Sequence, residues 1–319
     1  MFPKILRPIL ARILPSCRKI QHQLQQARDI MVPIIKERSK RKEGDDALQW
    51  MEGCAQGRPY DPVMAQIGFA AVSLHSTADM LTQVLYDLCE RVELIHALRE
   101  EVASVVQGEG LTVSTLHKLQ LMDSTLKESQ RLKPSLLGER HMAFLSKQQA
   151  FTNNSPKAAM QRIAQDTVTL SDGTTIPKDS CTVVASTRMR DPGVYSDPET
   201  FDAYRFLKLR QTSDQETYAQ ATTPSPEHMG WGLGKHACPG RALVVTEIKI
   251  ALCHILMKYD IKLRDGIRPQ PARHGIVFAA DGSTEIMIRR RKDYSSMWLE
   301  SRSGSIGDHG RDAREKVAL

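Results

Sequence analysis

One short segment of the chain gathers residues that could hold a metal centre. Residues 230–241 read Gly-Trp-Gly-Leu-Gly-Lys-His-Ala-Cys-Pro-Gly-Arg, directly before an apolar stretch, 242–256, with the periodicity of a helix. Glycine permits positive φ and lets the backbone approach a flat ligand closely. The start of a helix offers free N–H groups and partial positive charge, which favour the thiolate of Cys238. A lone thiolate held in this way suits axial ligation of haem iron.

This segment resembles the haem-binding loop of cytochromes P450, whose pattern is aromatic-x-x-Gly-x-basic-x-Cys-x-Gly. The matching positions, with Trp where Phe is more usual, are Trp231, Gly234, His236, Cys238 and Gly240. The resemblance implies haem as cofactor and Cys238 as the ligand of its iron. It also implies that Arg162, His236 and Lys235 hold the haem propionates. The alternative is a buried free cysteine beside a helix cap.

The most apolar long helix expected from the sequence spans 63–88, and polar side chains interrupt its centre. They lie within two turns and are Ser73, His75, Ser76, Thr77 and Asp79. Hydroxyls in buried helices are often tolerated because they bond back to a carbonyl of the preceding turn. In cytochromes P450 the corresponding helix crosses the distal haem face and carries an acid–alcohol pair. The match is partial, and it implies that His75, Ser76 and Thr77 relay protons to dioxygen.

A second helix, expected over 119–132, carries Glu128 and Arg131 on one face. Taken alone, such a pair is a surface salt bridge of little energetic weight. Its position upstream of the cysteine loop resembles the Glu-x-x-Arg motif of the P450 family. Arg205, after the Pro-Glu-x-Phe stretch that starts at Pro198, resembles the family's third partner. The resemblance implies a structural role, in which the three charges lock the core beside the loop.

The rest of the chain predicts a mainly α fold with small β-sheets (α+β), corresponding to the C-terminal part of the P450 fold. Further helices are expected at 16–42, interrupted at Pro33, and at 91–106 and 112–116, with a polar linker at 43–62. Strands are expected at 167–170, 174–176, 181–185, 259–263, 276–279 and 285–289. We interpret 1–292 as a partial P450 domain and 293–319 as a disordered tail, since the tail is rich in Ser, Gly and charge.

The composition limits the choice of partners and compartment. The net charge is +7, but no basic patch with interleaved aromatic residues appears, which argues against nucleic-acid binding. The six cysteines show no paired spacing, which favours a reducing compartment. No apolar run approaches the roughly 18 residues that span a bilayer. The resemblance implies the cytosolic face of the endoplasmic reticulum membrane, with membrane association only through an N-terminal anchor that the family carries upstream.

The chain departs from the family pattern in two places. The resemblance begins in the middle of the family sequence, which predicts an N-terminally truncated chain. Arg131 and Arg162 are also separated by more residues than in the family. The extra piece, 137–159, has neither a helical nor a strand period and contains the loop signal Asn-Asn-Ser-Pro at 153–156. We interpret this piece as a retained intron translated in frame rather than a functional insertion.

The resemblance implies a haem-thiolate monooxygenase that inserts one oxygen atom from O2 into an apolar small molecule, in secondary-metabolite (terpenoid-like) biosynthesis. NADPH–cytochrome P450 reductase would supply electrons and dock on Lys235, Arg241 and Lys249. One alternative is a truncated, catalytically inactive P450 fragment with weak or no haem binding. Another is a zinc site built from His236, Cys238, Cys253 and His254, although these spacings match no closed structural site.

Overall fold

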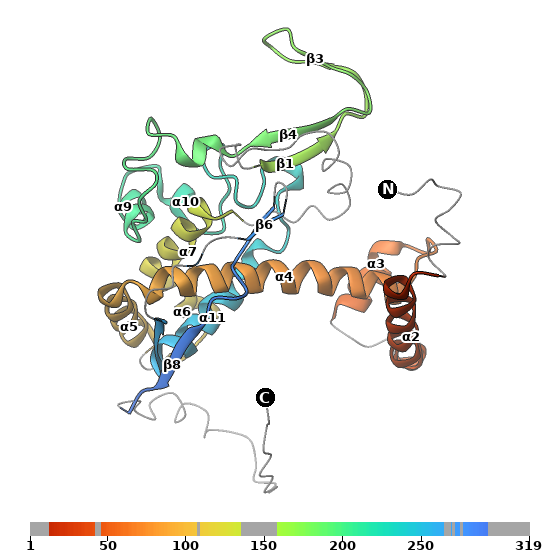
Figure 1. The fold of residues 1–319 in the computed structure, drawn as a ribbon, viewed down its shortest axis with the longest axis horizontal. Helices are drawn as coiled ribbons and strands as arrows, with labels where there is room; N and C mark the ends of the chain where they lie inside the picture. Colours follow the sequence, from red (N-terminus) through yellow and green to blue (C-terminus); the bar gives the residue numbers. More distant parts are fainter. Residues whose placement is uncertain are drawn as a thin grey trace, which may run out of the picture. The chain divides into compact units, whose positions relative to one another are not determined.

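The computed structural model describes residues 13–41, 46–106, 109–134, 158–264, 269, 272–274 and 277–292. The chain forms two compact units, Met1–His75 and Ser76–Leu319. Helices predominate, and the strands form small two-stranded antiparallel sheets (Figure 1). The fold class expected from the sequence, mainly α with small β-sheets, is therefore confirmed.

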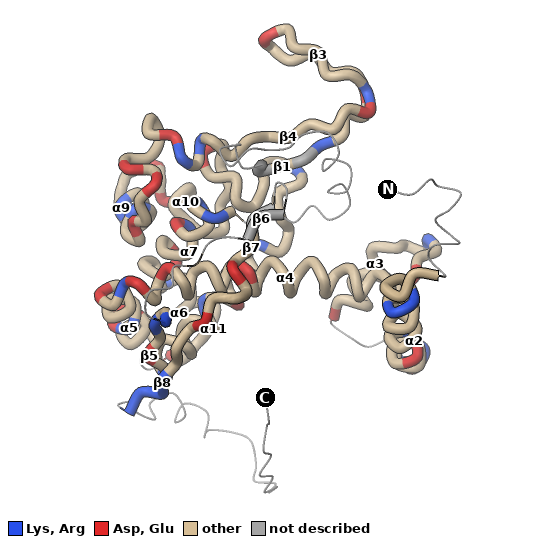
Figure 2. The backbone as a smooth tube through the Cα atoms, viewed as in Figure 1, with Lys and Arg blue, Asp and Glu red and all other residues tan. Residues whose placement is uncertain are grey.

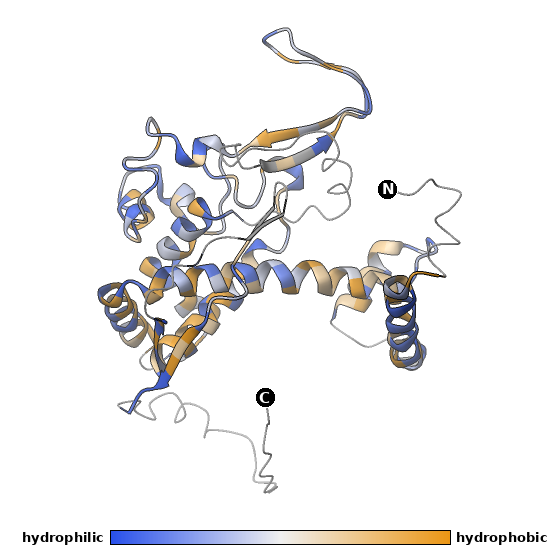
Figure 3. Cartoon of the chain, viewed as in Figure 1, coloured by the Kyte–Doolittle hydropathy of each residue, from blue (hydrophilic) through white to orange (hydrophobic). Residues whose placement is uncertain are grey.

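The first unit contains α2 (Pro15–Arg41), α3 (Ala47–Ala55) and the beginning of α4 (Pro62–Cys89). The sequence predicted an interruption of the first helix at Pro33, but α2 continues through it. Proline removes one backbone hydrogen bond and crowds the preceding turn, which bends a helix more often than it ends it. Pro33 is exposed on this mainly hydrophilic helix (Figure 3), so water can reach the carbonyl left without a partner.

The polar linker expected at 43–62 was wrong for its central part, which forms α3. Asp46 caps this helix, because its carboxylate accepts hydrogen bonds from the backbone N–H groups of Leu48 and Gln49 at 3.1 and 3.3 Å. Gln56 ends the helix with a left-handed conformation at φ 49°, and Gly57 follows. Both signals are visible in the sequence as an Asp before Ala-Leu-Gln and a Gly after the last turn.

The second unit is built around helices that share one apolar core. They are the rest of α4, α5 (Val92–Val106), α6 (Val113–Lys118), α7 (Gln120–Leu132) and α11 (Arg241–Lys258). Helix α11 packs against α5, α6 and α7. The most completely buried apolar side chains of this core are Val84, Leu88, Leu98, Val102, Leu119, Met122, Leu126, Leu252, Cys253 and Leu256. The helices expected at 63–88, 91–106, 119–132 and from 242 onward are all present within two residues of these bounds.

The strands lie in the second unit and form antiparallel pairs. Some pairs join strands that are close in the sequence, and others join strands that are further apart. The pairs are β1 (Ala158–Ile163) with β4 (Cys181–Ala185), β2 (Val168–Thr169) with β3 (Thr175–Ile176), β5 (Tyr259–Leu263) with β8 (Ile286–Arg290), and β6 (Ala272–His274) with β7 (Val277–Ala279). The β2–β3 hairpin extends beyond the β1–β4 ribbon (Figure 1). Basic residues stand at the end of β8 and directly after it, and they are blue in Figure 2.

Short elements complete the connections between these helices and strands. They are the 3-10 turns η2 (Thr187–Arg190) and η3 (Gly234–His236) and the helices α9 (Arg205–Arg210) and α10 (Glu216–Ala219). Within the described ranges, no helix is long and apolar enough to cross a membrane. The predicted tail at 293–319 and the predicted extra piece up to residue 157 lie outside the described residues. The last two residues of that piece, at 158 and 159, belong to β1.

Candidate functional site

The cysteine loop is a tight turn closed by backbone hydrogen bonds. Gly232 and Gly234 adopt positive φ angles of 72° and 75°, which only glycine takes without strain. The N–H of Cys238 donates to the carbonyl of Trp231 at 2.8 Å, so the loop returns to its own beginning. Gly240 is the N-cap of α11, which places Cys238 two residues before the cap. Cys238 is a free cysteine of intermediate exposure.

Two side chains of the 230–241 segment, Trp231 and Arg241, hold this loop in place. The indole N–H of Trp231 donates to the carbonyl of Ala221 at 2.7 Å. Arg241 donates through Nε to the carbonyl of Thr222 at 3.0 Å and through Nη1 to the carbonyl of Cys238 at 2.8 Å. Arg241, expected as a docking cation, is therefore partly buried and fixes the backbone of the cysteine it follows.

Part of the loop is clear of other protein atoms. A Cβ built at Gly234 or at Gly240 would meet no heavy atom within 4 Å. Lys235 and His236 beside them are exposed. Open glycine backbone, a partly exposed thiol and two exposed basic side chains form a surface that fits a flat anionic group such as haem. A single thiolate is also the donor that such a group's iron takes as an axial ligand.

Arg162 lies on β1, where it pairs with Thr182 of β4. The guanidinium Nη2 is 3.5 Å from the sulfur of Met160, and that sulfur also accepts the backbone N–H of Leu233 at 3.1 Å. Met160 thus links the strand of Arg162 to the cysteine loop. The structure brings this strand and the loop together, as the propionate assignment for Arg162 and His236 requires.

The predicted relay residues lie near the middle of α4. His75 is exposed, whereas Ser76 and Thr77 are partly buried. Of their polar neighbours, Ser73 donates to the carbonyl of Ala70 at 3.3 Å, the tolerated back-bonding geometry. Asp79 accepts the backbone N–H of Ala280 and the amide of Gln83. Ser73 and Asp79 therefore have structural partners, within α4 for Ser73 and within α4 and at Ala280 for Asp79.

Helix α7 is unusual because its polar side chains are buried along with its apolar ones. Residues 121–132 are all buried, and eight of them are polar or charged. A buried charge or polar group is destabilising unless it is paired. The helix therefore draws partners from segments distant in sequence, including η2, α9 and the stretch at 220–228.

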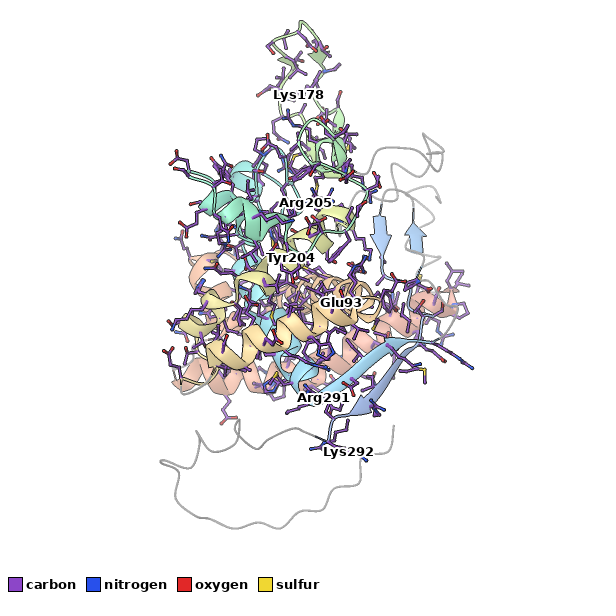
Figure 4. The ribbon with its side chains drawn as sticks, turned by 90° about the vertical axis from the view of Figure 1, so that its left-hand side faces the viewer. Glu93, Lys178, Tyr204, Arg205, Arg291 and Lys292 are labelled. Atoms are coloured by element: carbon purple, nitrogen blue, oxygen red, sulfur yellow. The ribbon has the colours of Figure 1, made fainter. Side chains whose placement is uncertain are left out.

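The first set of partners joins Glu128, Arg131 and Arg205. The Glu128 carboxylate meets Nε and Nη2 of Arg131 at 2.8 Å each, and both side chains are fully buried. Arg205, at the start of α9 (Figure 4), places its Nε 3.2 Å from the same carboxylate. Arg131 also donates through Nη1 to the carbonyls of Met189 and Pro198, each at 2.7 Å. Both arginines named from the sequence, Arg131 and Arg205, therefore contact the carboxylate of Glu128.

A second set surrounds Asp123 and corrects one expectation. Lys249 of α11 lies 2.7 Å from Asp123 and is buried at 4% exposure, so it is not part of a docking surface. Arg210 of α9 contacts the same carboxylate at 2.8 Å, and the backbone N–H of Ala221 donates to it at 2.8 Å. The residues next to Lys249 in the sequence do not indicate that it faces the core, because its partner Asp123 lies on another helix.

Sequence reasoning also missed a buried pair next to the loop, Lys127 and His228. The Lys127 ammonium donates to the carbonyls of Gln220 and Thr223 at 2.8 Å, and burial lowers the pKa of this lysine to about 7. His228 Nε2 is 3.0 Å from the carbonyl of Lys127, so the neutral ring carries its proton on Nε2. Burial lowers the pKa of His228 to about 3. Neither residue belongs to a pattern that a sequence reader would single out.

The zinc arrangement considered from the sequence is not assembled. Across the described ranges, no group of three or more His, Cys, Asp or Glu side chains gathers in a way that could hold a metal ion. Cys253 is buried in the core of α11, whereas His254 is exposed. Adjacent positions on this helix point to different surroundings, so they do not converge with Cys238.

Comparisons with known proteins show the family of this chain. The family model described as Cytochrome P450 matches residues 1–144 and 154–284. The cytochrome P450 monooxygenase adrA of Penicillium rubens is 46% identical over 305 residues, which cover 92% of this chain and 56% of that protein. The cytochrome P450 monooxygenase trt6 of Aspergillus terreus is 45% identical over 302 residues, which cover 92% of this chain and 58% of that protein.

The chain belongs to the cytochrome P450 family, as its cysteine loop indicated. It spans about half the length of the curated relatives it matches. The family match leaves out residues 145–153, which lie inside the extra piece expected at 137–159.

Replacing Glu128 tests whether the charges of α7 are as tightly coupled as their burial implies. Glu128→Gln leaves Arg131 buried without its counter-ion, which should lower the unfolding free energy by roughly 3–5 kcal/mol. Glu199→Gln is the matched control, because Glu199 pairs with Arg190 at the surface and is 67% exposed. The control should change stability by less than about 1 kcal/mol. Equal losses in urea unfolding would contradict the proposal that the buried pair locks the core.

The buried imidazole of His228 predicts a specific pH dependence. Its pKa falls from the usual 6.5 to about 3 in the folded state, so between these values only the unfolded chain binds the proton. The unfolding free energy should therefore fall as pH drops below 6.5, by up to about 1.4 kcal/mol per unit from this residue. His228→Gln should remove that part of the slope between pH 7.5 and 5, and substitution of the exposed His96 should not. Parallel slopes for wild type and His228→Gln would refute the assignment.

Proposed function

We propose that this chain carries the thiolate side of a haem monooxygenase, with Cys238 as the ligand of the iron. The observation that carries the proposal is the loop geometry, in which Gly232, Gly234 and the Trp231 carbonyl hold Cys238 two residues before the cap of α11. The start of a helix stabilises negative charge on the sulfur. When bound, haem supplies the activation of dioxygen that inserts one oxygen atom into an apolar small molecule.

Other residues of the loop and of β1 would orient the haem by binding its propionate groups. Arg162, His236 and Lys235 are the cations assigned to the propionates. The position of Arg162 supports this assignment, because Met160 connects its strand to Leu233 in the loop. Trp231, Gly234 and Gly240 would contact the ring side. Gly234 and Gly240 leave open space where a side chain would stand.

Cys238→Ser tests the ligand assignment directly. Serine keeps the size of the side chain and removes the sulfur, so wild-type protein should give the thiolate-haem band in its reduced carbon-monoxide spectrum and the variant should not. Cys253→Ser is the matched control, because Cys253 is buried in the core of α11 and lies away from the loop. A thiolate-type band retained in Cys238→Ser would overturn the assignment.

On the distal side, His75, Ser76 and Thr77 are proposed to move protons from solvent toward dioxygen. The imidazole of His75 is exposed to water, and the hydroxyl residues that follow it, Ser76 and Thr77, are partly buried. Hydroxyls pass protons by accepting one and donating another, as general acids acting through water do.

Thr77→Val should raise the hydrogen peroxide released per NADPH consumed and lower product formation by roughly 10²-fold, the typical weight of one proton-transfer group. Ser73→Ala is the control, since its hydroxyl already bonds to the carbonyl of Ala70. An unchanged ratio of peroxide to product in Thr77→Val would remove this residue from the relay.

The substrate is proposed to be an apolar small molecule of secondary metabolism, terpenoid-like in character. The support is similarity: relatives named cytochrome P450 monooxygenases in Penicillium rubens and Aspergillus terreus are 46% and 45% identical to this chain. Incubating the full-length protein with terpenoid scaffolds and a reductase, with products read by mass spectrometry, tests the class. Oxidation confined to fatty acids would contradict it.

Electrons are proposed to come from NADPH–cytochrome P450 reductase, whose acidic surface would meet Lys235. The structure restricts this docking role, because Lys249 is buried and Arg241 is committed to the loop backbone. Exposed charges steer encounter and are screened by salt. Lys235→Glu should therefore slow electron transfer at low ionic strength and have little effect at high ionic strength. An effect that is independent of salt would point to a damaged loop and contradict docking.

A second candidate is a catalytically inactive fragment with weak or no haem binding. It is supported by apolar side chains exposed on the first part of α4, namely Met64, Ile67, Phe69, Val72 and Leu74. Apolar patches of this kind are rare on soluble monomers. Haem titration of the 319-residue chain separates the two candidates: tight uptake with a thiolate band supports the enzyme, and no uptake supports the fragment.

A further inference from the structure

Gln130 is the exception on the buried helix α7. Its neighbours Asp123, Lys127, Glu128 and Arg131 all place their polar atoms against partners. The Gln130 side chain is 5% exposed, and its Oε1 has no hydrogen-bond partner in the described part of the chain. A buried amide oxygen without a partner is destabilising, so its place in this helix calls for another explanation.

The explanation lies at the first residue of the cysteine loop. A Cβ added to Gly230 would stand 2.4 Å from both Cδ and Oε1 of Gln130, and 2.7 Å from its Cγ. These separations are below the 3.0 Å that real Cβ contacts respect. The φ of Gly230 is not in the left-handed region, so a side chain at this position would be opposed by the buried Gln130 side chain and not by backbone conformation. The amide of Gln130 occupies the volume that a side chain at 230 would fill.

Gly230 is connected to Cys238 through its neighbour in the sequence and one hydrogen bond. The next residue is Trp231, whose carbonyl accepts the N–H of Cys238 at 2.8 Å. Gly232 closes the turn by donating its N–H to the carbonyl of Met229 at 2.9 Å. A displacement of the backbone at 230 therefore moves the carbonyl that holds Cys238.

We propose that Gln130 is a positioning residue that sets the distance between the cysteine loop and α7 by packing its amide against Gly230. Through this contact, the helix fixed by Glu128 and Arg131 fixes the backbone that presents Cys238. The role assigned to the thiol rests on the proposed function, but the contact between Gln130 and Gly230 does not. The contact acts through shape, because Cγ and Cδ of Gln130 lie in the volume that a side chain at 230 would fill.

The proposal predicts a size exchange between the two positions. Gly230→Ala should force the loop away from α7, and Gln130→Ala should remove the obstacle, so the double variant should recover what the single Gly230→Ala loses. Gln130→Met keeps the length of the side chain without its polar atoms and should behave as wild type. Gly53→Ala, an exposed glycine of α3 with nothing within 4 Å of its Cβ, is the control for the substitution itself.

Iodoacetamide alkylation of Cys238 in the haem-free chain, followed by mass spectrometry of the peptide, gives a readout that does not require activity. Overpacking should increase local opening of the loop, so Gly230→Ala should react faster by about tenfold. The double variant Gly230→Ala/Gln130→Ala should return to within about twofold of wild type, because sites in direct contact are not additive. Cys54, which is exposed on α3, reports on each preparation and should react at the same rate throughout.

A double variant that reacts as fast as Gly230→Ala would overturn the proposal, as would Gly230→Ala reacting like wild type. Should Gly230→Ala fail to fold, recovery of folded protein by the added Gln130→Ala supports the proposal and continued failure overturns it. In haem-loaded protein, the thiolate band should follow the same order across the variants. Absence of haem uptake by wild type would refute the proposed function, while the alkylation series would still decide the role of Gln130.

Discussion

The pairing of charges buried on α7 is the constraint on which the second unit depends. Glu128 and Arg131 are fully buried, and neither could remain so without the other. Their bond leaves further donors and acceptors that Arg205 and the carbonyls of Met189 and Pro198 satisfy. Irregular chain between β4 and α10 thus folds over the helix because its backbone supplies what the charges need. Met189, Tyr195 and Phe206 of the same region are buried as well and add apolar packing.

The position of the cysteine loop depends on this arrangement of charges on α7. Lys127 holds the carbonyls of Gln220 and Thr223, and Trp231 donates to Ala221 in the same stretch. The segment that approaches the loop is therefore tied to α7 before the glycines begin. Positive φ at Gly232 and Gly234 then turns the chain so that Cys238 precedes α11.

Two lysines that were expected to share one docking surface end in opposite environments. Lys235 is exposed beside the cysteine, whereas Lys249 lies in the core against Asp123. The difference follows from their elements: η3 is a short surface turn, and α11 is enclosed by α5, α6 and α7. A buried lysine is tolerated when a carboxylate stands opposite, and that carboxylate comes from a helix more than a hundred residues earlier in the chain. Of the three cations expected at that surface, Lys235 is exposed, Arg241 is partly buried and Lys249 is buried.

The sequence by itself determined the family, the mainly α fold, the loop around Cys238 and the three charges at 128, 131 and 205. These follow from local spacing, because a glycine-shaped turn before a helix and an i,i+3 pair can be read within a few residues. It also indicated most helices to within two residues. It failed at Pro33, where the helix continues, and at α3, where capping outweighed composition. Only the tertiary structure decided which polar residues are buried. The partners of Lys249 and His228, and the glycine next to Gln130, come from distant segments. Burial therefore depends on which surfaces the folded chain brings together.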